Sequence, residues 1–241
     1  MVKHGLLDKV VVITGASHGF GRIAAARFAA AGSSVVLAAR TDLDAVRIDC
    51  ELAGGNALPV PTDVRDQRQV EQLLDAAVKK FGRVDVWVNN AGIAAAGEFE
   101  KIALELHKDV LETNLLGTFY GCFFALKHFR AQSSGILINI AAPPGKMESF
   151  LVSYAAAKSG VIGLSEALRQ ELKSEGETQI HVCTVMPRGV LSRPESHAEL
   201  QAGDGVPLIE AAVADGVVDA LLELAVHPKN EVTIEAPRYF A

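Results

Sequence analysis

The stretch that decides the fold runs from Lys9 to Gly21 and reads K-V-V-V-I-T-G-A-S-H-G-F-G. It begins with a run of β-branched residues, which is typical of a buried parallel strand. A glycine-rich turn follows, and the Ala-rich segment from Phe20 to Ala31 then reads as a helix that ends at Gly32. The order of strand, glycine turn and helix predicts the first unit of an α/β chain.

The remainder of the chain repeats this alternation. Further strands are expected at residues 34–39, 57–61, 84–88, 135–140, 180–186 and 231–235, and helices at 43–53, 66–80, 100–130, 153–174 and 208–226. The pattern predicts an α/β fold class with three layers, namely a Rossmann fold built on a doubly wound, seven-stranded parallel sheet with helices on both faces. Residues 1–241 are expected to form a single domain, with a short loop at about 192–207.

Composition and charge exclude several classes of protein. The chain has 241 residues, a net charge of −6 and 22% charged residues, so no basic surface for nucleic acid or an anionic membrane is implied. The longest uncharged run that is rich in aromatic residues, Leu115 to Leu126, is shorter than the roughly 20 residues of a membrane span. The N-terminal residues lack the apolar run of a signal peptide. Three separated cysteines are expected to be buried thiols, and the protein is expected to be soluble and cytoplasmic.

The glycine turn is the first candidate binding site. Gly15, Gly19 and Gly21 allow the backbone to turn tightly and to approach a ligand closely. The following helix directs its free N–H groups and the positive end of its dipole towards that ligand. The sequence therefore predicts a dinucleotide pyrophosphate at this turn, although the GxxxGxG spacing alone is also compatible with a turn needed only for packing.

The end of the second strand bears on the choice between NADP and NAD. An NAD site usually has an acidic residue here, whereas this chain reads Ala38-Ala39-Arg40. Arg40 can pair with a 2′-phosphate, with help from His18, which favours NADP over NAD. The rival is Asp42, which is close enough in sequence to reach the ribose, and Arg40 would then be a solvated charge.

Tyr154 and Lys158 form the candidate reacting pair. They are four residues apart in a predicted helix and so share one face. A lysine ammonium beside a phenol is expected to lower the pKa of the phenol, which then exchanges a proton with a carbonyl oxygen. The motif is short enough to arise by chance, and the alternative is an exposed pair on a helix surface.

Five motifs in order make the chain similar to a known family. They are T-G-A-S-H-G-F-G at residues 14–21, Asp63-Val64, N-N-A-G at residues 89–92, Asn114, and Y-A-A-A-K at residues 154–158. Together they closely resemble the classical short-chain dehydrogenase/reductase family over nearly the whole chain.

The resemblance implies roles for individual residues. Asn114 would anchor a water in a proton relay, Tyr154 would be the general acid/base, and Lys158 would hold the nicotinamide ribose and tune Tyr154. The residues implied to bind the cofactor are Gly15, Ser17, His18, Gly19, Phe20, Gly21, Arg40, Asp63, Val64, Asn90, Ala91, Gly92, Tyr154, Lys158, Pro187, Val190 and Ser192.

The chain departs from the family pattern in the reacting region. The position of the catalytic Ser is Ala142, or Ala141 if the residues are counted back from Tyr154. Ser149 is the better candidate to replace the missing hydroxyl, because Ser153 is expected to point away from the reacting face. The usual Pro-Gly after the sixth strand is Pro187-Arg188, and Ser192 replaces a Thr.

These observations lead to an oxidoreductase that uses NADP, with NAD less favoured, and acts on a small carbonyl or alcohol substrate. The rival is a dinucleotide-binding protein with little turnover, either a sensor or a structural partner, which the missing hydroxyl favours. A structural dimer module with a stabilising dinucleotide is a third, weaker class. The histidines form no metal motif, so no metal is expected, and His107 and His128 are expected to be surface or interface residues. The apolar segment Leu115 to Leu126 predicts contact with a partner subunit, and the family resemblance implies a homodimer or homotetramer.

Overall fold

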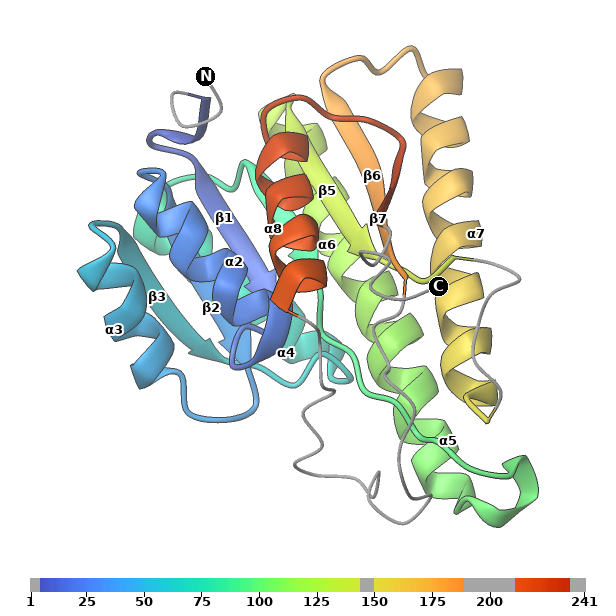
Figure 1. The fold of residues 1–241 in the computed structure, drawn as a ribbon. Helices are drawn as coiled ribbons and strands as arrows, with labels where there is room; N and C mark the ends of the chain where they lie inside the picture. Colours follow the sequence, from blue (N-terminus) through green and yellow to red (C-terminus); the bar gives the residue numbers. More distant parts are fainter. Residues whose placement is uncertain (1–4, 144–149, 189–210, 235–241) are drawn as a thin grey trace.

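The computed structural model describes residues 5–143, 150–188 and 211–234. Its centre is a seven-stranded sheet in the order β3-β2-β1-β4-β5-β6-β7, and all neighbouring strands are parallel (Figure 1). The strands are β1 (Val10–Thr14), β2 (Ser34–Ala39), β3 (Asn56–Pro61), β4 (Val86–Asn89), β5 (Gly135–Ile140), β6 (Ile180–Pro187) and β7 (Glu231–Ile234). The predicted seven-stranded, doubly wound sheet is confirmed.

Helices cover both faces of this sheet, which makes three layers (Figure 1). They are α2 (Gly19–Ala30), α3 (Asp44–Leu52), α4 (Gln67–Phe81), α5 (Leu104–Leu111), α6 (Gly117–Gln132), α7 (Val152–Ser174) and α8 (Ala211–Leu224). Buried side chains of α2, α3 and α8 pack against one face, and those of α4, α6 and α7 pack against the other. None of the described helices combines the length and the apolar character that crossing a membrane requires.

The strands are apolar on both sides because both faces are covered. In β1, Val11 and Ile13 belong to the hydrophobic cluster under α2, whereas Val10 and Val12 belong to the cluster under α4. Successive side chains of a strand point to opposite faces, so a continuous apolar run suits a strand buried on both sides. This is the physical basis of the fold prediction from the first strand.

The predicted helical region 100–130 is interrupted in the structure. A 3₁₀ turn (Phe99–Lys101) precedes α5, and a π-helical segment (Glu112–Leu116) joins α5 to α6. Asn114 lies within this π segment, and its side-chain amide donates to the carbonyl oxygens of Ile93 and Val110. The extra residue in this turn therefore directs the Asn114 side chain towards the loop after β4. Such π segments within helices are frequent at functional sites.

The strand order reverses between β1 and β4, and this locates the site. In an open parallel sheet, ligands bind in the crevice beyond the carboxyl ends of the strands at such a switch point. The glycine turn follows β1, and the N-N-A-G segment runs from the end of β4. The fold thus brings these two motifs to the same crevice.

Candidate active site

The glycine turn is shaped by two positive φ angles and by a close backbone approach. Gly15 and Gly19 have φ values of 64° and 52°, which disfavour other residues. A Cβ on Gly21 would lie 2.3 Å from the Gly15 carbonyl oxygen, so any side chain there would displace the turn. His18 is the N-cap of α2, but its side chain does not cap the first turn and instead contacts the Ser17 hydroxyl at 2.9 Å. The first turn of α2 is therefore open to an anion.

Asn90 ties this turn to the neighbouring strand. Its side-chain amide donates to the carbonyl oxygens of Thr14 at 2.9 Å and Gly15 at 3.1 Å. The backbone N–H groups of Asn90 and Ala91 both donate to the Thr14 hydroxyl. The switch point between β1 and β4 is thus fixed by side-chain hydrogen bonds before any ligand binds.

Arg40 lies exposed at the end of β2, one strand away from the glycine turn. Its charge contributes to lowering the pKa of Asp63, although the main cause is the hydrogen bond from Arg65. The rival acid, Asp42, accepts a hydrogen bond from the Asp44 backbone N–H at 2.9 Å and so supports the start of α3. Asp42 therefore already has a local structural role, whereas Arg40 is exposed.

The predicted adenine-side residues, Asp63 and Val64, are both already engaged. The guanidinium of Arg65 donates several hydrogen bonds to the Asp63 carboxylate, the shortest being 2.7 Å from Nη2 to Oδ2. It also donates to Asp109. Val64 is buried against Gly117, where a Cβ would lie 2.7 Å from a Val64 methyl. The Asp63 position is therefore rigid and its charge is largely compensated.

Asn114 is fully buried and keeps one polar atom without a partner. Its Nδ2 is satisfied by two carbonyls, but Oδ1 has no hydrogen-bond partner within the described part of the chain. A Cβ on Gly92 would lie 2.6 Å from this oxygen and 3.6 Å from the Lys158 ammonium. The space beside Gly92 is thus bordered by an acceptor and a cation, which suits a bound water or ligand hydroxyl.

Tyr154 and Lys158 share one face of α7, as their spacing predicts. The Lys158 ammonium lies 5.6 Å from the centre of the Tyr154 ring and donates to the Ile140 carbonyl oxygen at 2.8 Å. Burial lowers the pKa of Lys158 to about 8 and raises the pKa of Tyr154 to about 12.

The prediction that Lys158 lowers the pKa of Tyr154 is therefore wrong for the protein alone. The ammonium lies over the ring face, and one of its N–H groups donates to a backbone carbonyl oxygen. Burial is consequently the effect that dominates at the half-buried phenol.

Two buried alanines occupy the end of β5 where the family pattern has a hydroxyl. Ala141 packs in a small cluster with Val161 and Met186, and its N–H bonds to the Val185 carbonyl oxygen. Ala142 is also buried but belongs to none of the hydrophobic clusters formed by the described residues. Pro143 is buried as well, and the candidate Ser149 lies outside the described residues. Ala141 thus has a packing role, which Ala142 does not share.

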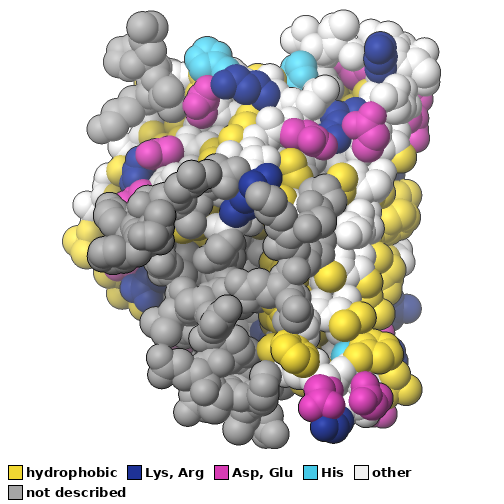
Figure 2. All heavy atoms as spheres, turned by 45° about the vertical axis from the view of Figure 1, so that its right-hand side comes forward, with side chains coloured by type: hydrophobic (Ala, Val, Ile, Leu, Met, Phe, Trp, Pro, Cys, Tyr) yellow, Lys and Arg dark blue, Asp and Glu magenta, His cyan; other side chains and the backbone are white. Residues whose placement is uncertain are grey.

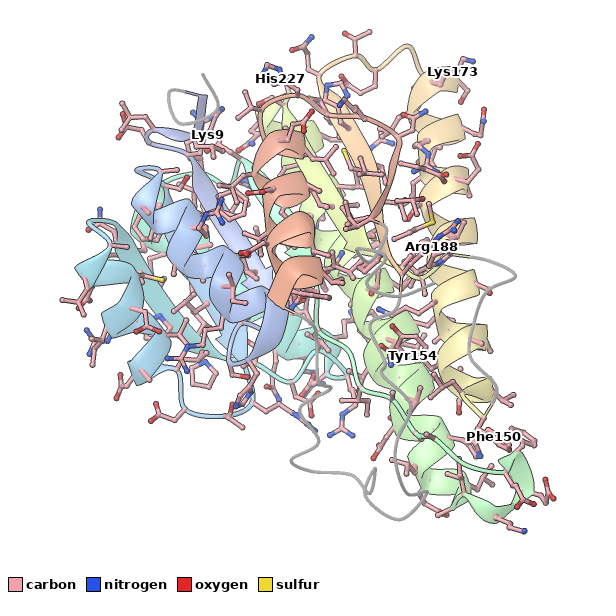
Figure 3. All side chains as sticks on the ribbon, in the orientation of Figure 1. Lys9, Phe150, Tyr154, Lys173, Arg188 and His227 are labelled. Atoms are coloured by element: carbon pink, nitrogen blue, oxygen red, sulfur yellow. The ribbon has the colours of Figure 1, made fainter. Side chains whose placement is uncertain are left out.

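The segment after β6 is only partly described. Pro187 ends β6 and is buried, and the Arg188 N–H donates to the Ile234 carbonyl oxygen at 2.9 Å. Figure 3 shows Arg188 beside α7, further along the helix than Tyr154. Val190, Ser192 and the loop at about 192–207 lie outside the described residues.

The contact of His107 with the candidate site was not predicted from the sequence. The prediction that His107 is a surface or interface residue is wrong, because it is only 6% exposed and hydrogen-bonds to the Ser153 hydroxyl. The Ser153 hydroxyl is therefore engaged beside Tyr154, away from solvent. His128 is half-buried, and its Nε2 has no partner among the described residues. The sequence signals the role of His107 only weakly, through its position seven residues before Asn114.

A cavity of about 360 Å³ lies elsewhere in the molecule. Charged and polar side chains line much of it, among them Glu166, Arg169 and Lys173, and none of the candidate site residues does. Figure 3 shows Lys173 at the opposite end of α7 from Tyr154. Within the described residues, no cluster of three or more His, Cys, Asp or Glu side chains is placed to hold a metal ion. The described candidate site residues lie instead around the crevice beyond β1, β4 and β5.

The parallel sheet, the glycine turn after its first strand and the crevice at the switch point define a Rossmann-type α/β protein. The Tyr–Lys pair on α7 beside a buried Asn narrows the class further. The sequence model of the short chain dehydrogenase family matches residues 9–201, and the chain belongs to this family.

Individual relatives agree with this assignment. The chain is 32% identical over 235 residues to an oxidoreductase of Bacillus subtilis, covering 95% of this chain and 66% of that longer relative. It is 35% identical over 225 residues to 3beta-hydroxysteroid dehydrogenase 1 of Eggerthella lenta, covering 91% of this chain and 85% of the relative. The crystal structure of a metagenomic short-chain oxidoreductase in complex with NADP is similar with a TM-score of 0.78 and 27% identity, covering 95% and 98% of the two chains.

Proposed function

We propose that this chain is an NADP(H)-dependent oxidoreductase that reduces a small carbonyl compound to an alcohol, or catalyses the reverse. The observation that carries the proposal is the pairing of Tyr154 with Lys158 on α7, because the Lys158 ammonium and Asn114 Oδ1 together border the space beside Gly92. Family membership and the NADP complex of a similar structure support the same reaction class. The glycine turn fits a pyrophosphate, because its positive φ angles and the excluded Cβ of Gly21 leave backbone N–H groups accessible.

Each residue of the site has a chemical task in this proposal. When bound, the nicotinamide cofactor supplies or accepts the hydride. Tyr154 gives its phenolic proton to the carbonyl oxygen of the substrate. Lys158 holds a positive charge over the ring, and the polar space bordered by Asn114 Oδ1 would give water a route to return a proton to Tyr154. Hydrogen bonds from Asn114 to Ile93 and Val110 keep this acceptor in place.

The protonation states favour reduction. Burial raises the pKa of Tyr154 to about 12, so at pH 7 the phenol is protonated and able to donate. Burial lowers the pKa of Lys158 to about 8, so the ammonium is still mostly charged at pH 7 and is easily deprotonated. The reverse reaction requires a phenolate, which this environment disfavours in the protein alone.

Arg40 supports NADP rather than NAD as the cofactor. The exposed guanidinium is at the end of β2, and the nearby Asp63 carboxylate is compensated by Arg65 rather than by Arg40. A guanidinium suits a phosphate dianion through two parallel hydrogen bonds. Asp42 has a competing local bond to the Asp44 N–H, which weakens the case for NAD.

A dinucleotide-binding protein with little turnover is the second candidate. Ala142 favours it, because no hydroxyl is available there to orient a substrate oxygen. The retained Tyr154, Lys158 and Asn114 favour the enzyme. Oxidation of NADPH in the presence of a panel of ketones, aldehydes and diketones separates the two functions. Turnover that depends on Tyr154 supports the enzyme, whereas tight NADPH binding without turnover on the panel supports the binding protein.

The proposed enzyme is a homodimer or homotetramer. Leu116, at the end of the π segment, and Phe119 and Phe123 on α6 are exposed, with 42%, 47% and 55% of each residue accessible. Figure 2 shows hydrophobic side chains along the edge of the molecule on the side of Figure 1 that carries α5 to α7. Such a face is usually covered by a partner. Light scattering at micromolar concentration is expected to give a dimer or tetramer, and Phe119→Glu with Phe123→Glu is expected to dissociate it. A monomeric wild-type protein would contradict this part of the proposal.

A further inference from the structure

A buried histidine links two elements beside the reacting tyrosine. His107 lies on α5, and its Nε2 is 2.9 Å from the Phe99 carbonyl oxygen. Its Nδ1 hydrogen-bonds to the hydroxyl of Ser153, which is the residue before Tyr154. His107 is 6% exposed and Ser153 is 5% exposed, so water does not compete effectively for either bond.

The two partners fix the proton on the imidazole ring. A carbonyl oxygen only accepts hydrogen bonds, so Nε2 must carry the proton and donate to Phe99. In the neutral ring, Nδ1 is then the acceptor, and the Ser153 hydroxyl donates to it. The ring of Phe99 also packs on the imidazole, with the two centres 4.7 Å apart. His107 is therefore held from two sides and has one orientation in which both bonds form.

The position of Ser153 makes this bond relevant to Tyr154. Both residues lie in the first turn of α7, where the N-cap Leu151 makes no side-chain capping bond. The preceding Phe150 has a φ of 71°, an unfavourable value for a residue other than glycine. The first turn of a helix has few internal hydrogen bonds and frays easily unless other contacts hold it. The His107–Ser153 bond is such a contact, and it acts one residue away from the phenol.

We propose that His107 is a positioning residue, which holds the first turn of α7 through Ser153 and thereby directs the Tyr154 hydroxyl at the substrate. This inference rests on the proposed role of Tyr154 as proton donor. Consecutive residues of a helix point about 100° apart, so Ser153 is held towards α5 while Tyr154 remains directed to the crevice. His107 does not touch the reacting atoms, and its effect passes through the backbone of two adjacent residues.

The test compares variants that remove either end of the bond. His107→Phe keeps an aromatic ring but removes both hydrogen bonds, and Ser153→Ala removes the hydroxyl alone. His107→Asn keeps an amide oxygen near the place of Nδ1 and serves as the conservative variant. His128→Phe is the control, because His128 is also a histidine on a helix, is half-buried and lies outside the site. The double variant His107→Phe/Ser153→Ala tests whether the two residues act as one unit.

Three measurements are made on each protein. The first two are kcat with the best carbonyl of the panel and the Kd for NADPH. The third is the NMR signal of Tyr154 in protein labelled with ¹³C at the tyrosine Cζ atoms. The chain has three tyrosines, and the signal is assigned by its loss in Tyr154→Phe. This signal reports the setting of the phenol even if no substrate turns over, so failure of the proposed function is distinguishable from failure of this inference.

We expect kcat to fall by about 10-fold to 100-fold in His107→Phe and Ser153→Ala, since a small misplacement of a reacting group has effects of this size. The NADPH Kd is expected to change less than about 2-fold, the Tyr154 signal to shift or broaden, and His107→Asn to recover part of the rate. The double variant should be no slower than the slower single variant.

An unchanged Tyr154 signal in both single variants would overturn the inference. So would losses in kcat and NADPH affinity that run in parallel, or effects equal to those of His128→Phe, because these indicate a general loss of structure. Additive losses in the double variant would also overturn it, because they would show that the two residues do not act through one bond.

Discussion

The loops that follow β1 and β5 begin at the same edge of the sheet, but they differ in how well their polar groups are paired. In the loop after β1, polar groups find partners within the chain, since Asn90 and Thr14 hold the glycine turn with four hydrogen bonds. At the end of β5, two alanines replace the expected hydroxyl, and the nearby Asn114 Oδ1 has no partner among the described residues. Both ionisable groups there, Tyr154 and Lys158, have pKa values shifted by burial towards their neutral forms.

This difference between the two loops suggests different tasks, ligand binding at the loop after β1 and reaction at the end of β5. A turn that is already fixed by the chain's own hydrogen bonds is preorganised, so little ordering is needed when a ligand binds. A buried group without a partner is costly to the protein, and such groups persist where a ligand or water completes them. We therefore expect the β1 side of the crevice to bind the cofactor and the β5 side to carry out the reaction. The predictions below test this division in order of expected effect.

The largest effect is expected from Tyr154→Phe. The change removes the proposed proton donor and keeps the ring under the Lys158 ammonium, so kcat is expected to fall by about 10²-fold to 10⁴-fold. NADPH binding, measured by fluorescence quenching, is expected to change less than about 2-fold because the β1 side is intact. Tyr120→Phe on α6 is the control. A Tyr154→Phe protein that keeps its rate would break the division between the two regions.

The second prediction restores the missing hydroxyl. Ala142→Ser is expected to raise kcat by up to about 10²-fold to 10³-fold, because one preorganised donor to the substrate oxygen is typically worth that much. NADPH affinity should hardly change. Ala141→Ser is the control and is expected to give no gain, since Ala141 packs against Val161 and Met186. If Ala142→Ser is no faster and Ser149→Ala inactivates the wild-type sequence, the hydroxyl is supplied by Ser149 instead.

The third prediction concerns the β1 side alone. Arg40→Ala is expected to weaken NADPH binding by about 10-fold to 100-fold, the range for losing a charged hydrogen-bonding pair. NADH binding should be unaffected, so the preference between the two cofactors disappears. Titration of both cofactors checks this, and Arg27→Ala, which removes a guanidinium paired with Asp219, controls for net charge. Equal affinities for NADPH and NADH in the unmutated protein would remove the argument from Arg40.

The smallest effect, measured in stability, is expected from Lys158→Met. Burial lowers the pKa of Lys158 from 10.5 to about 8, which at pH 7 costs the folded protein about 3 kcal/mol at most. Loss of the bond to the Ile140 carbonyl offsets about 1–2 kcal/mol of that. The variant is therefore expected to be more stable at pH 7 by about 1–2 kcal/mol, measured by urea unfolding, while turnover is lost.

The pH dependence gives the sign of the same effect. Between pH 8 and 10.5 the unfolded chain binds more protons at Lys158 than the folded protein does. The free energy of unfolding from this residue therefore rises with pH across that window, and the advantage of Lys158→Met shrinks. Unfolding at pH 7, 8 and 9 for both proteins checks this. An advantage of the variant that grows with pH would show that Lys158 is not destabilised by burial.

The sequence by itself determined the parts that depend on local patterns. The β-branched run at Val10–Thr14, the glycines at 15, 19 and 21 and the strand–helix alternation fixed the fold class, because period and turn chemistry are properties of neighbouring residues. The spacing of Tyr154 and Lys158 fixed their shared face in the same way. The two alanines at the end of β5 were also evident from counting along the chain.

Only the tertiary structure decided how those residues are set. The π segment at Asn114, the burial of His107 and its bond to Ser153 join residues 21 to 46 positions apart, and no local pattern encodes such contacts. The direction of the pKa shift of Tyr154 was predicted wrongly. The sequence shows that a lysine is near, but it does not show which groups the ammonium contacts. In the folded chain the Ile140 carbonyl oxygen accepts a hydrogen bond from the Lys158 ammonium, and burial decides the pKa of the phenol.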